Sequence, residues 1–302
     1  LLPNEFAAQN HLEEAKGVYV PFWFFDGTAS GSAVFHTTTS TTHRRGGDTV
    51  CITRHYECRR AGEIDFALVP VDASKQMDDD LMDSVEPYNY EDLQPFSTGF
   101  LPGYLADIHD VDAEECFERA YTRCAATCVK ALESTVQGYE SCHLSGKNIA
   151  LRNGVVHYGL LPVYLLNTRC DDKKYTFAVN GQTGKVIGNL PISTAKSVGR
   201  FFTRFFIALL IEVVIGAVSL AQSGDGMPLD IGMIIEDFGM VLAGMGIAAA
   251  IIGGISVANA RAKMKPVAIA SEAGRYTRGD LRLSLSTDTF QYERTKVIER
   301  KQ

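Results

Sequence analysis

Two long apolar runs, joined by a short acidic turn, constrain the fold of this chain more than any other feature. The first run, Phe201 to Ala221, carries only Arg204 and Glu212 as charged residues, and the second, about Phe238 to Ala258, carries none. A helix rises about 1.5 Å per residue, so roughly 20 residues cross the hydrocarbon core of a bilayer. Both runs have that length, and we expect a transmembrane helical hairpin over residues 200–260.

The second run has no polar face. A helix that is apolar all round lies against lipid or inside a very large core, and we therefore favour a membrane hairpin over the alternative, two helices buried in a soluble domain. Small residues recur every four positions in this run, at Gly246, Ala250, Gly254 and Ala258. Such a ladder is typical of helix contacts in membranes, and we predict that these four residues form a packing surface.

The charges that flank the hairpin predict its orientation. Three basic residues precede the first run and three follow the second, whereas the turn between them has only acidic charges (Lys196, Arg200, Arg204; Arg261, Lys263, Lys265; Asp225, Asp230, Glu236, Asp237). Short segments rich in Lys and Arg stay in the cytoplasm. We therefore expect a multi-pass protein of the cell (inner) membrane with both termini in the cytoplasm and the acidic turn outside.

Glu212 is the candidate functional residue of the first run, because it lies near the middle of the segment, where a charge is costly. We interpret it as a polar contact to the second helix, through Ser256 or Asn259, or to another subunit. The alternative is that Glu212 lines a polar path. Arg204 lies eight residues earlier and is expected to reach the cytoplasmic surface rather than to pair with Glu212.

The rest of the sequence predicts an α+β fold, with an antiparallel, β-rich cytoplasmic domain that contains one long helix. We expect a β-meander in residues 1–110, in four strands (17–26, 30–42, 48–59 and 62–71), and then a short helix capped by Ser74. In residues 111–195 we expect a long helix, Ala113 to Gln137, followed by two hairpins. One hairpin would turn at Asn153–Gly154 and the other at residues 180–185. We expect residues 266–302 to form a cytoplasmic tail whose single strand could pair with the sheet or with a neighbouring subunit.

Composition and cysteine spacing exclude several classes of protein. The net charge of -7 gives no support for nucleic-acid binding, which usually needs a basic patch. The seven cysteines include no Cys-x-x-Cys pair, so the residues predict neither a zinc ribbon nor a disulfide framework. Cys124 and Cys128 fall on the apolar face of the long helix and are interpreted as core residues.

Several strings of residues, taken in order, resemble one family of bacterial membrane proteins. They are the strings from Gly17 to Asp26, Val71 to Pro87, Gly103 to Asp107, Leu161 to Asn167 and Tyr175 to Lys185. The family is usually labelled as containing a zinc ribbon of the transcription-factor-B type, and some members are labelled as primosomal helicase-like proteins. The resemblance implies an N-terminal zinc ribbon, for which this sequence has no paired Cys-x-x-Cys motifs. It also implies a membrane-stress partner of the SPFH (flotillin-like) class.

No pattern in the sequence supports catalysis. The turn Gly181 to Lys185 is too short for a phosphate-binding loop and leads into a strand, so we interpret it as a tight turn. The best candidate metal cluster is His36, His43, His55 and Cys58, in which His36 and His43 could meet across strands, but we interpret these as ordinary exposed strand residues. Cys51 and Cys58 are too widely spaced for a zinc knuckle, and the acids from Asp107 to Glu115 do not match a calcium loop. We predict a non-enzymatic membrane anchor and scaffold, without cofactor or metal, that contacts lipid and partner proteins and forms an oligomer. The alternative is a small channel or transporter subunit that uses Glu212.

Overall fold

The structure is a computed structural model, and it describes residues 1–3, 6, 12–45, 48–170, 173–222 and 231–298. Two long strands form the centre of its sheet, β1 (Leu12–Arg45) and β2 (Asp48–Asp72), and they pair antiparallel over most of their length. The prediction of four strands in this region is therefore wrong. Residues 27–29 and 60–61, which the prediction left between strands, lie within the two long strands, and residues 46–47, predicted as a turn, lie outside the described residues.

Asp26, Gly31 and Gly62 lie inside the two long strands and do not form turns between strands. Asp26 lies in a β-bulge, where the register shifts between Phe25 and Gly27. Gly31 stands opposite Gly62 in the next strand, and a Cβ added to Gly31 would come 2.0 Å from the carbonyl oxygen of Asn148. These residues allow a bulge and a close approach of strands, which are common uses of such residues within a sheet.

Five further strands complete the sheet. β4 (Ser141–Cys170) runs straight through Asn153–Gly154, so the hairpin expected there is wrong. β5 (Lys173–Asn180) and β6 (Val186–Gly188) form the other expected hairpin. β7 (Thr277–Ile298) pairs antiparallel with β2, which is the first of the two alternatives considered for the tail strand. The strand order is β6-β5-β4-β1-β2-β7, and the short β3 (Leu105–Ala106) runs parallel to β1. The α+β class and the predominantly antiparallel sheet are confirmed.

The described residues include four α-helices: α2 (Asp79–Val85), α3 (Ala113–Ser134), α4 (Thr194–Gln222) and α5 (Ile231–Lys263). Single 3-10 turns lie at Tyr90–Asp92, Thr98–Phe100 and Gly274–Tyr276. The long helix expected from Ala113 is confirmed. The expected cap of α2 is wrong, because Asp78 rather than Ser74 accepts the backbone N–H of Leu81, and Ser74 donates to Asp107 instead.

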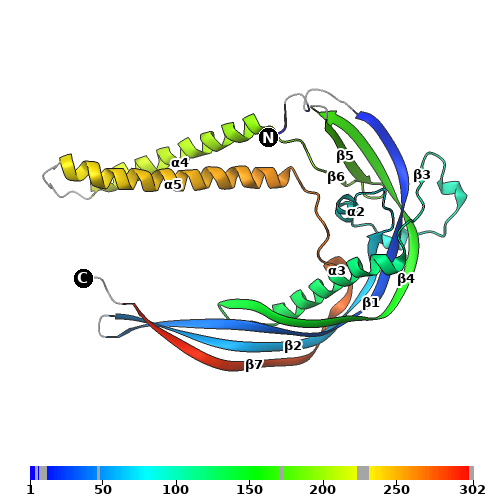
Figure 1. Cartoon of the computed structure of the whole chain (residues 1–302), viewed down its shortest axis with the longest axis horizontal. Helices are drawn as coiled ribbons and strands as arrows, with labels where there is room; N and C mark the ends of the chain where they lie inside the picture. The colour runs from blue at the N-terminus through cyan, green and yellow to red at the C-terminus, as the bar shows by residue number, and fades with distance from the viewer. Residues whose placement is uncertain (4–5, 7–11, 46–47, 171–172, 223–230, 299–302) are drawn as a thin grey trace. The chain divides into compact units, whose positions relative to one another are not determined.

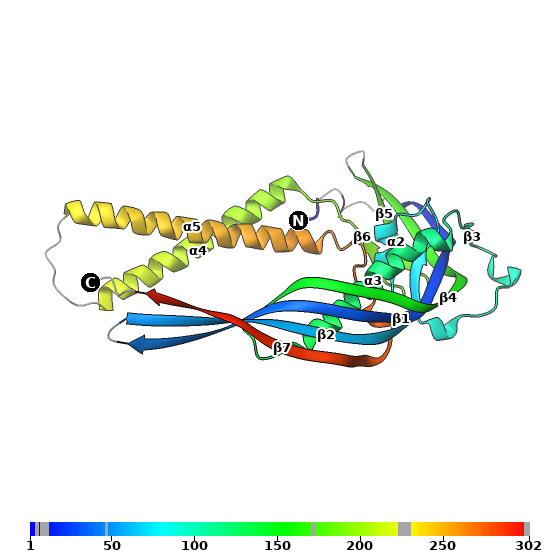
Figure 2. The same ribbon diagram turned by 60° about the horizontal axis from the view of Figure 1, so that its bottom comes forward.

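The chain folds as two compact units, each built from segments that are distant in sequence. Unit 1 comprises residues 1–16, 164–179 and 185–267, and unit 2 comprises residues 17–163, 180–184 and 268–302. In unit 2, α3 lies along one face of β1 and β2 (Figures 1 and 2). The face of α3 that meets the sheet combines thiol, alanine and aliphatic side chains, with Cys124 and Cys128 buried in it as expected.

In unit 1, α4 and α5 run side by side in opposite directions (Figures 1 and 2). Among the described residues, one helical stretch is long and apolar enough to cross a membrane, Gly244–Lys263 of α5, and 11% of it is buried. The acidic turn predicted between the two apolar runs falls mostly on residues 223–230, which lie outside the described residues. The two-helix transmembrane hairpin stays a prediction.

Candidate functional site

The small-residue ladder (Gly246, Ala250, Gly254 and Ala258) lies on α5, but the contact between α5 and α4 is made by the neighbouring stripe. Ala249 is fully buried, and a Cβ added to Gly253 would lie 3.0 Å from the ring and 3.1 Å from the carbonyl oxygen of Phe201. Gly254 and Ala258 are exposed, and a Cβ on Gly246 or Gly254 would meet nothing within 4 Å. Gly246 and Ala250 are partly buried, so the half of the ladder at Gly254 and Ala258 is the part most accessible to a further helix.

Glu212 lies on α4 and is partly buried. Its Oε2 atom is enclosed and has no hydrogen-bond partner among the described residues. Of the two residues considered as partners, Ser256 accepts a hydrogen bond from Arg200 Nε at 3.3 Å, and Asn259 is exposed. An enclosed carboxylate oxygen without a partner is costly. Glu212 therefore needs a compensating polar contact beyond those that the described residues of α4 and α5 provide.

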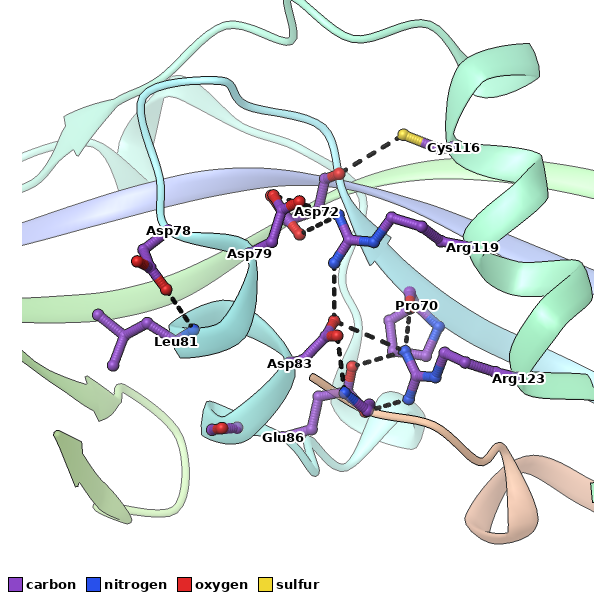
Figure 3. Close-up of polar contacts among 12 residues, drawn as sticks. Pro70, Asp72, Asp78, Asp79, Leu81, Asp83, Glu86, Cys116, Arg119 and Arg123 are labelled. Carbon is purple, nitrogen blue, oxygen red and sulfur yellow. Dashed lines mark hydrogen bonds and ion pairs between the residues drawn. The ribbon is translucent and has the colours of Figure 1, made fainter. Parts of the chain in front are cut away.

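A second polar site lies in unit 2, where α3 meets α2 and the end of β2. Two arginines and four acidic side chains form this ionic cluster (Arg119, Arg123, Asp72, Asp79, Asp83 and Glu86), shown in Figure 3. Arg119 and Arg123 are one turn apart on α3, so their side chains lie on the same side of the helix. Both extend toward the carboxylates of α2, as the close-up shows.

Arg123 is the more deeply buried arginine, with 4% of its side chain exposed. Its Nη2 donates to Glu86 Oε2 at 2.8 Å, and its Nη1 donates to Glu86 Oε1 at 3.2 Å and to the carbonyl oxygen of Pro70 at 2.7 Å. The hydroxyl of Tyr276 donates a further short hydrogen bond to Glu86. Burial raises the pKa of Glu86, and the hydrogen bonds from Arg123 oppose that shift. The pair joins α3, the end of α2 and the 3-10 turn at Gly274–Tyr276.

Arg119 connects three acidic side chains at the other end of the cluster. It donates to Asp72 Oδ1 and to Asp83 Oδ1, each at 2.9 Å, and lies 3.2 Å from Asp79. The second oxygen of Asp72 has no hydrogen-bond partner among the described residues, and burial raises the pKa of Asp72 to about 7. The pKa of Asp72 is therefore shifted toward neutral pH, because the effect of burial outweighs the opposing charge of Arg119.

A cavity of about 610 Å³ borders this end of the cluster, lined among others by Asp72, Asp79, Glu115 and Arg119. Within the described part of the chain, no group of three or more His, Cys, Asp or Glu residues is arranged to hold a metal ion. The nearby thiol of Cys116 is buried, which raises its pKa to about 11 and leaves it protonated at neutral pH. The arrangement supports charge neutralisation inside the fold better than it supports catalysis.

The turn between β5 and β6 matches its interpretation as a tight turn. The side chain of Asn180 accepts the backbone N–H groups of Gln182 and Thr183 at 2.9 and 2.8 Å, and Gly184 adopts a positive φ of 73°. Backbone N–H groups that cradle a phosphate must be free to donate to it. Here two of them are already bound to Asn180, so the turn has no phosphate-binding geometry.

The ionic cluster is not among the sites predicted from the sequence, although a signal for it exists. Arg119 and Arg123 interrupt the buried face of α3 at positions adjacent to Ala120 and Cys124. Charged residues on the buried face of a helix need partners of opposite charge. The acids from Asp72 to Glu86 supply them, and several of these acids are also explained by a simpler role, as favourable charges at a helix N-terminus.

Comparison with known proteins gives one relative and no family. The chain is 38% identical over 197 residues to a protein of Bacillus subtilis (strain 168) described as the uncharacterized protein YdjG. The match covers 65% of this chain and 58% of that protein, so the chain spans somewhat more than half the length of its relative. No family model matches the chain. No solved structure matches it either.

Proposed function

We propose that this chain is a non-enzymatic, multi-pass anchor of the cell membrane, with both termini in the cytoplasm, whose α+β part assembles with partner proteins. The observation that carries the proposal is the exposed apolar surface of α4 and α5. Val213 and Ile215 on α4, and Ile251 and Ile255 on α5, are each about half exposed. In water such a surface would be unfavourable, because apolar area gains roughly 25 cal/mol per Å² when it leaves water.

The proposal makes α4 the second membrane-crossing helix. Its charged residues Lys196, Arg200 and Arg204 lie in the first turns, where long basic side chains extend to the membrane surface. Between Arg204 and the end of the helix Glu212 is the one charged residue. A single carboxyl group is compatible with a membrane helix when it faces another helix or a polar cavity.

The ladder on α5 is the surface that we propose for assembly. Gly254 and Ala258 allow the backbone of another helix to approach closely, which is how helices associate in lipid. For the partner we propose an SPFH (flotillin-like) membrane protein, the class that the sequence resemblance implies. The acidic net charge argues against a nucleic-acid partner.

Two measurements test this proposal. Extraction of membranes with alkaline carbonate should leave the chain in the pellet, and a reporter fused to its C-terminus should be active only on the cytoplasmic side. Purification in mild detergent should then recover the chain in a complex with other membrane proteins. Recovery of the chain as a water-soluble monomer, or a C-terminal reporter outside the cell, would contradict the proposal.

A second candidate function is ion or solute passage along α4, favoured by the enclosed Oε2 atom of Glu212, which has no hydrogen-bond partner among the described residues. In this case Glu212→Gln should abolish flux across liposomes that contain the protein, while the size of the complex stays the same. If Glu212→Gln breaks up the complex instead, Glu212 is an assembly contact. Unchanged flux in the variant would remove the transport function.

A further inference from the structure

Unit 2 contains an apolar pocket on the face of the sheet opposite to α3. The pocket has a volume of about 810 Å³ and lies under the loop of residues 88–104, which precedes β3 in Figure 1. Phe24 of β1 lines the pocket, whereas its neighbour Phe25 belongs to the core beneath α3. Successive residues of a strand point to opposite faces. Phe24 therefore faces away from the α3 core, on the side of the sheet where the pocket lies.

A strained residue lines this pocket. Leu68 has a positive φ of 53°, which is uncommon for a bulky side chain, and its backbone N–H donates to Asp26 Oδ1 at 2.7 Å. Leu68 lies in β2 opposite the bulge of β1, so Phe66 and Val69 both face the core while Leu68 lines the pocket. Bulges often redirect a side chain beside a functional site, and local strain is concentrated at ligand contacts.

The rim of the pocket continues into an exposed apolar surface. Leu93, Phe96 and Phe100 line the pocket from the loop and are 42%, 63% and 47% exposed. Leu105 and Ile108, which follow in sequence, are 57% and 76% exposed. Exposed apolar side chains that gather around a groove are typical of interaction sites. A small molecule would fill the pocket but leave these side chains in water.

The charges around the pocket indicate the kind of partner that it would bind. No Lys or Arg residue lines the pocket, as far as the described residues extend, and its acidic residue, Asp92, is held at the rim by hydrogen bonds from Asn89 Nδ2 at 2.8 Å and Gln182 Nε2 at 3.0 Å. From Asp72 to Glu118 the sequence has fourteen Asp or Glu residues and one Lys. The acids of this segment that lie outside the ionic cluster repel phosphates, anionic lipid headgroups and nucleic acid, and they attract cations over a distance of about 10 Å at ordinary ionic strength.

We infer that the pocket docks a basic segment of a partner protein, which inserts an aromatic or aliphatic side chain and places Lys or Arg beside Asp92. The inference deepens the proposed function and rests on it, because it states the chemistry of the segment that the cytoplasmic part recruits. The apolar anchor supplies affinity from the pocket, and the flanking charges supply orientation and speed of association.

Fluorescence anisotropy with short labelled peptides tests this inference on the full chain in nanodiscs of zwitterionic lipid. The first peptide consists of Lys, Phe and Leu. In the second every Lys is replaced by Glu, and in the third every Phe and Leu is replaced by Ser. The first should bind and the other two should bind at least about tenfold more weakly, because each lacks one of the two required features.

Variants locate the binding to the pocket. Phe96→Ser combined with Phe100→Ser should weaken binding of the Lys-Phe-Leu peptide at least about tenfold, and Asp92→Asn several-fold. The matched controls are Leu283→Ser combined with Phe290→Ser, which are 43% and 51% exposed on β7, and Glu293→Gln on the same strand. These controls should bind the peptide as the unchanged protein does.

Three results would overturn the inference: no binding of the Lys-Phe-Leu peptide, equal binding of the Glu peptide, or equal binding by the Phe96→Ser, Phe100→Ser variant. Saturation of the pocket by the uncharged dye N-phenyl-1-naphthylamine without competition from the peptide would instead identify a small-molecule site. Carbonate extraction of the same variants separates this inference from the proposed function. Loss of peptide binding with the chain still in the membrane fraction refutes only the pocket.

Discussion

Replacing Arg123 by Ala should destabilise unit 2 by several kcal/mol. Arg123 is nearly fully buried, and the substitution removes both of its hydrogen bonds to the enclosed Glu86 carboxylate, to which Tyr276 still donates. It also removes the donor that lies 2.7 Å from the carbonyl oxygen of Pro70. Breaking a buried ion pair by removing one partner costs about 3–5 kcal/mol. We expect about 4 kcal/mol, because protonation of Glu86, whose pKa burial already raises, relieves part of the penalty.

The sole tryptophan of the chain makes this change measurable in one unit. Trp23 lies in unit 2, and its Nε1 donates to the carbonyl oxygen of Val111 at 2.9 Å. Its fluorescence therefore follows the unfolding of unit 2 in urea without a signal from α4 or α5. With a slope of about 2–3 kcal/mol per molar urea for a unit of this size, the midpoint should fall by roughly 1.5 M.

Lys130→Ala is the matched control, because Lys130 lies further along the same helix and also pairs with an acidic residue. The Lys130–Glu272 pair is 2.8 Å long, like the Arg123–Glu86 pair, but its side chains are 66% and 44% exposed. Exposed pairs contribute about 0–1 kcal/mol. Equal midpoints for Arg123→Ala and Lys130→Ala would refute the reasoning.

Three further predictions follow from the structure. The folded-state pKa of Asp72 is raised above its usual 3.8 to about 7, so the contribution of Asp72 to stability is greatest below about pH 4 and is lost as the pH rises through 7. The Asp72→Asn variant should not show that loss. Thermal unfolding at pH 5 and pH 8 tests this, and the same pH dependence in the variant and the unchanged protein would contradict the prediction. Gly31→Ala should destabilise unit 2 by about 3 kcal/mol, because the added Cβ would lie 2.0 Å from a backbone oxygen. The control is Gly146→Ala on β4, whose Cβ would have nothing within 4 Å and which should change the urea midpoint little. Equal effects of the two variants would refute the close approach of the strands at Gly31. Gly253→Leu should disrupt the contact between α4 and α5, whereas Gly254→Leu should leave that contact intact and dissociate the complex. Cross-linking of the helix pair tests the first effect, and gel filtration in detergent tests the second. If neither variant dissociates the complex, the ladder is not an assembly surface.

The helices were easier to predict than the strands, and the reason is physical. A helix is a local structure, so the spacing from Cys116 to Leu132 on α3 and the apolar runs of α4 and α5 contain most of the information that forms them. Strand length depends on partners that are distant in sequence. β1 extends to Arg45 because β2 and β4 lie beside it, and nothing in residues 17–45 alone distinguishes one long strand from two short ones.

The turn signals failed for a related reason. Asp-Gly and Asn-Gly pairs allow unusual backbone conformations, but those conformations serve bulges as well as hairpins. Asn153 has the positive φ of 54° that a hairpin turn requires, yet β4 continues past it. Asp26 accepts the N–H of Leu68, a residue 42 positions away, and this bond holds a bulge instead of closing a turn. The sequence shows where the backbone can deviate, and the neighbouring strand decides how.

The placement of the two arginines of α3 also explains why so much negative charge stays on the surface of unit 2. Arg119 and Arg123 face inward and neutralise the buried acids Asp72, Asp83 and Glu86. The exposed acids from Glu91 to Glu118 have no Lys or Arg within their own segment. Asp112, Glu114 and Glu115 lie at the N-terminus of α3, where negative charge is favourable. The other exposed acids repel one another but accelerate association with a partner of opposite charge, which is the property that the inferred docking of a basic segment beside the apolar pocket would use.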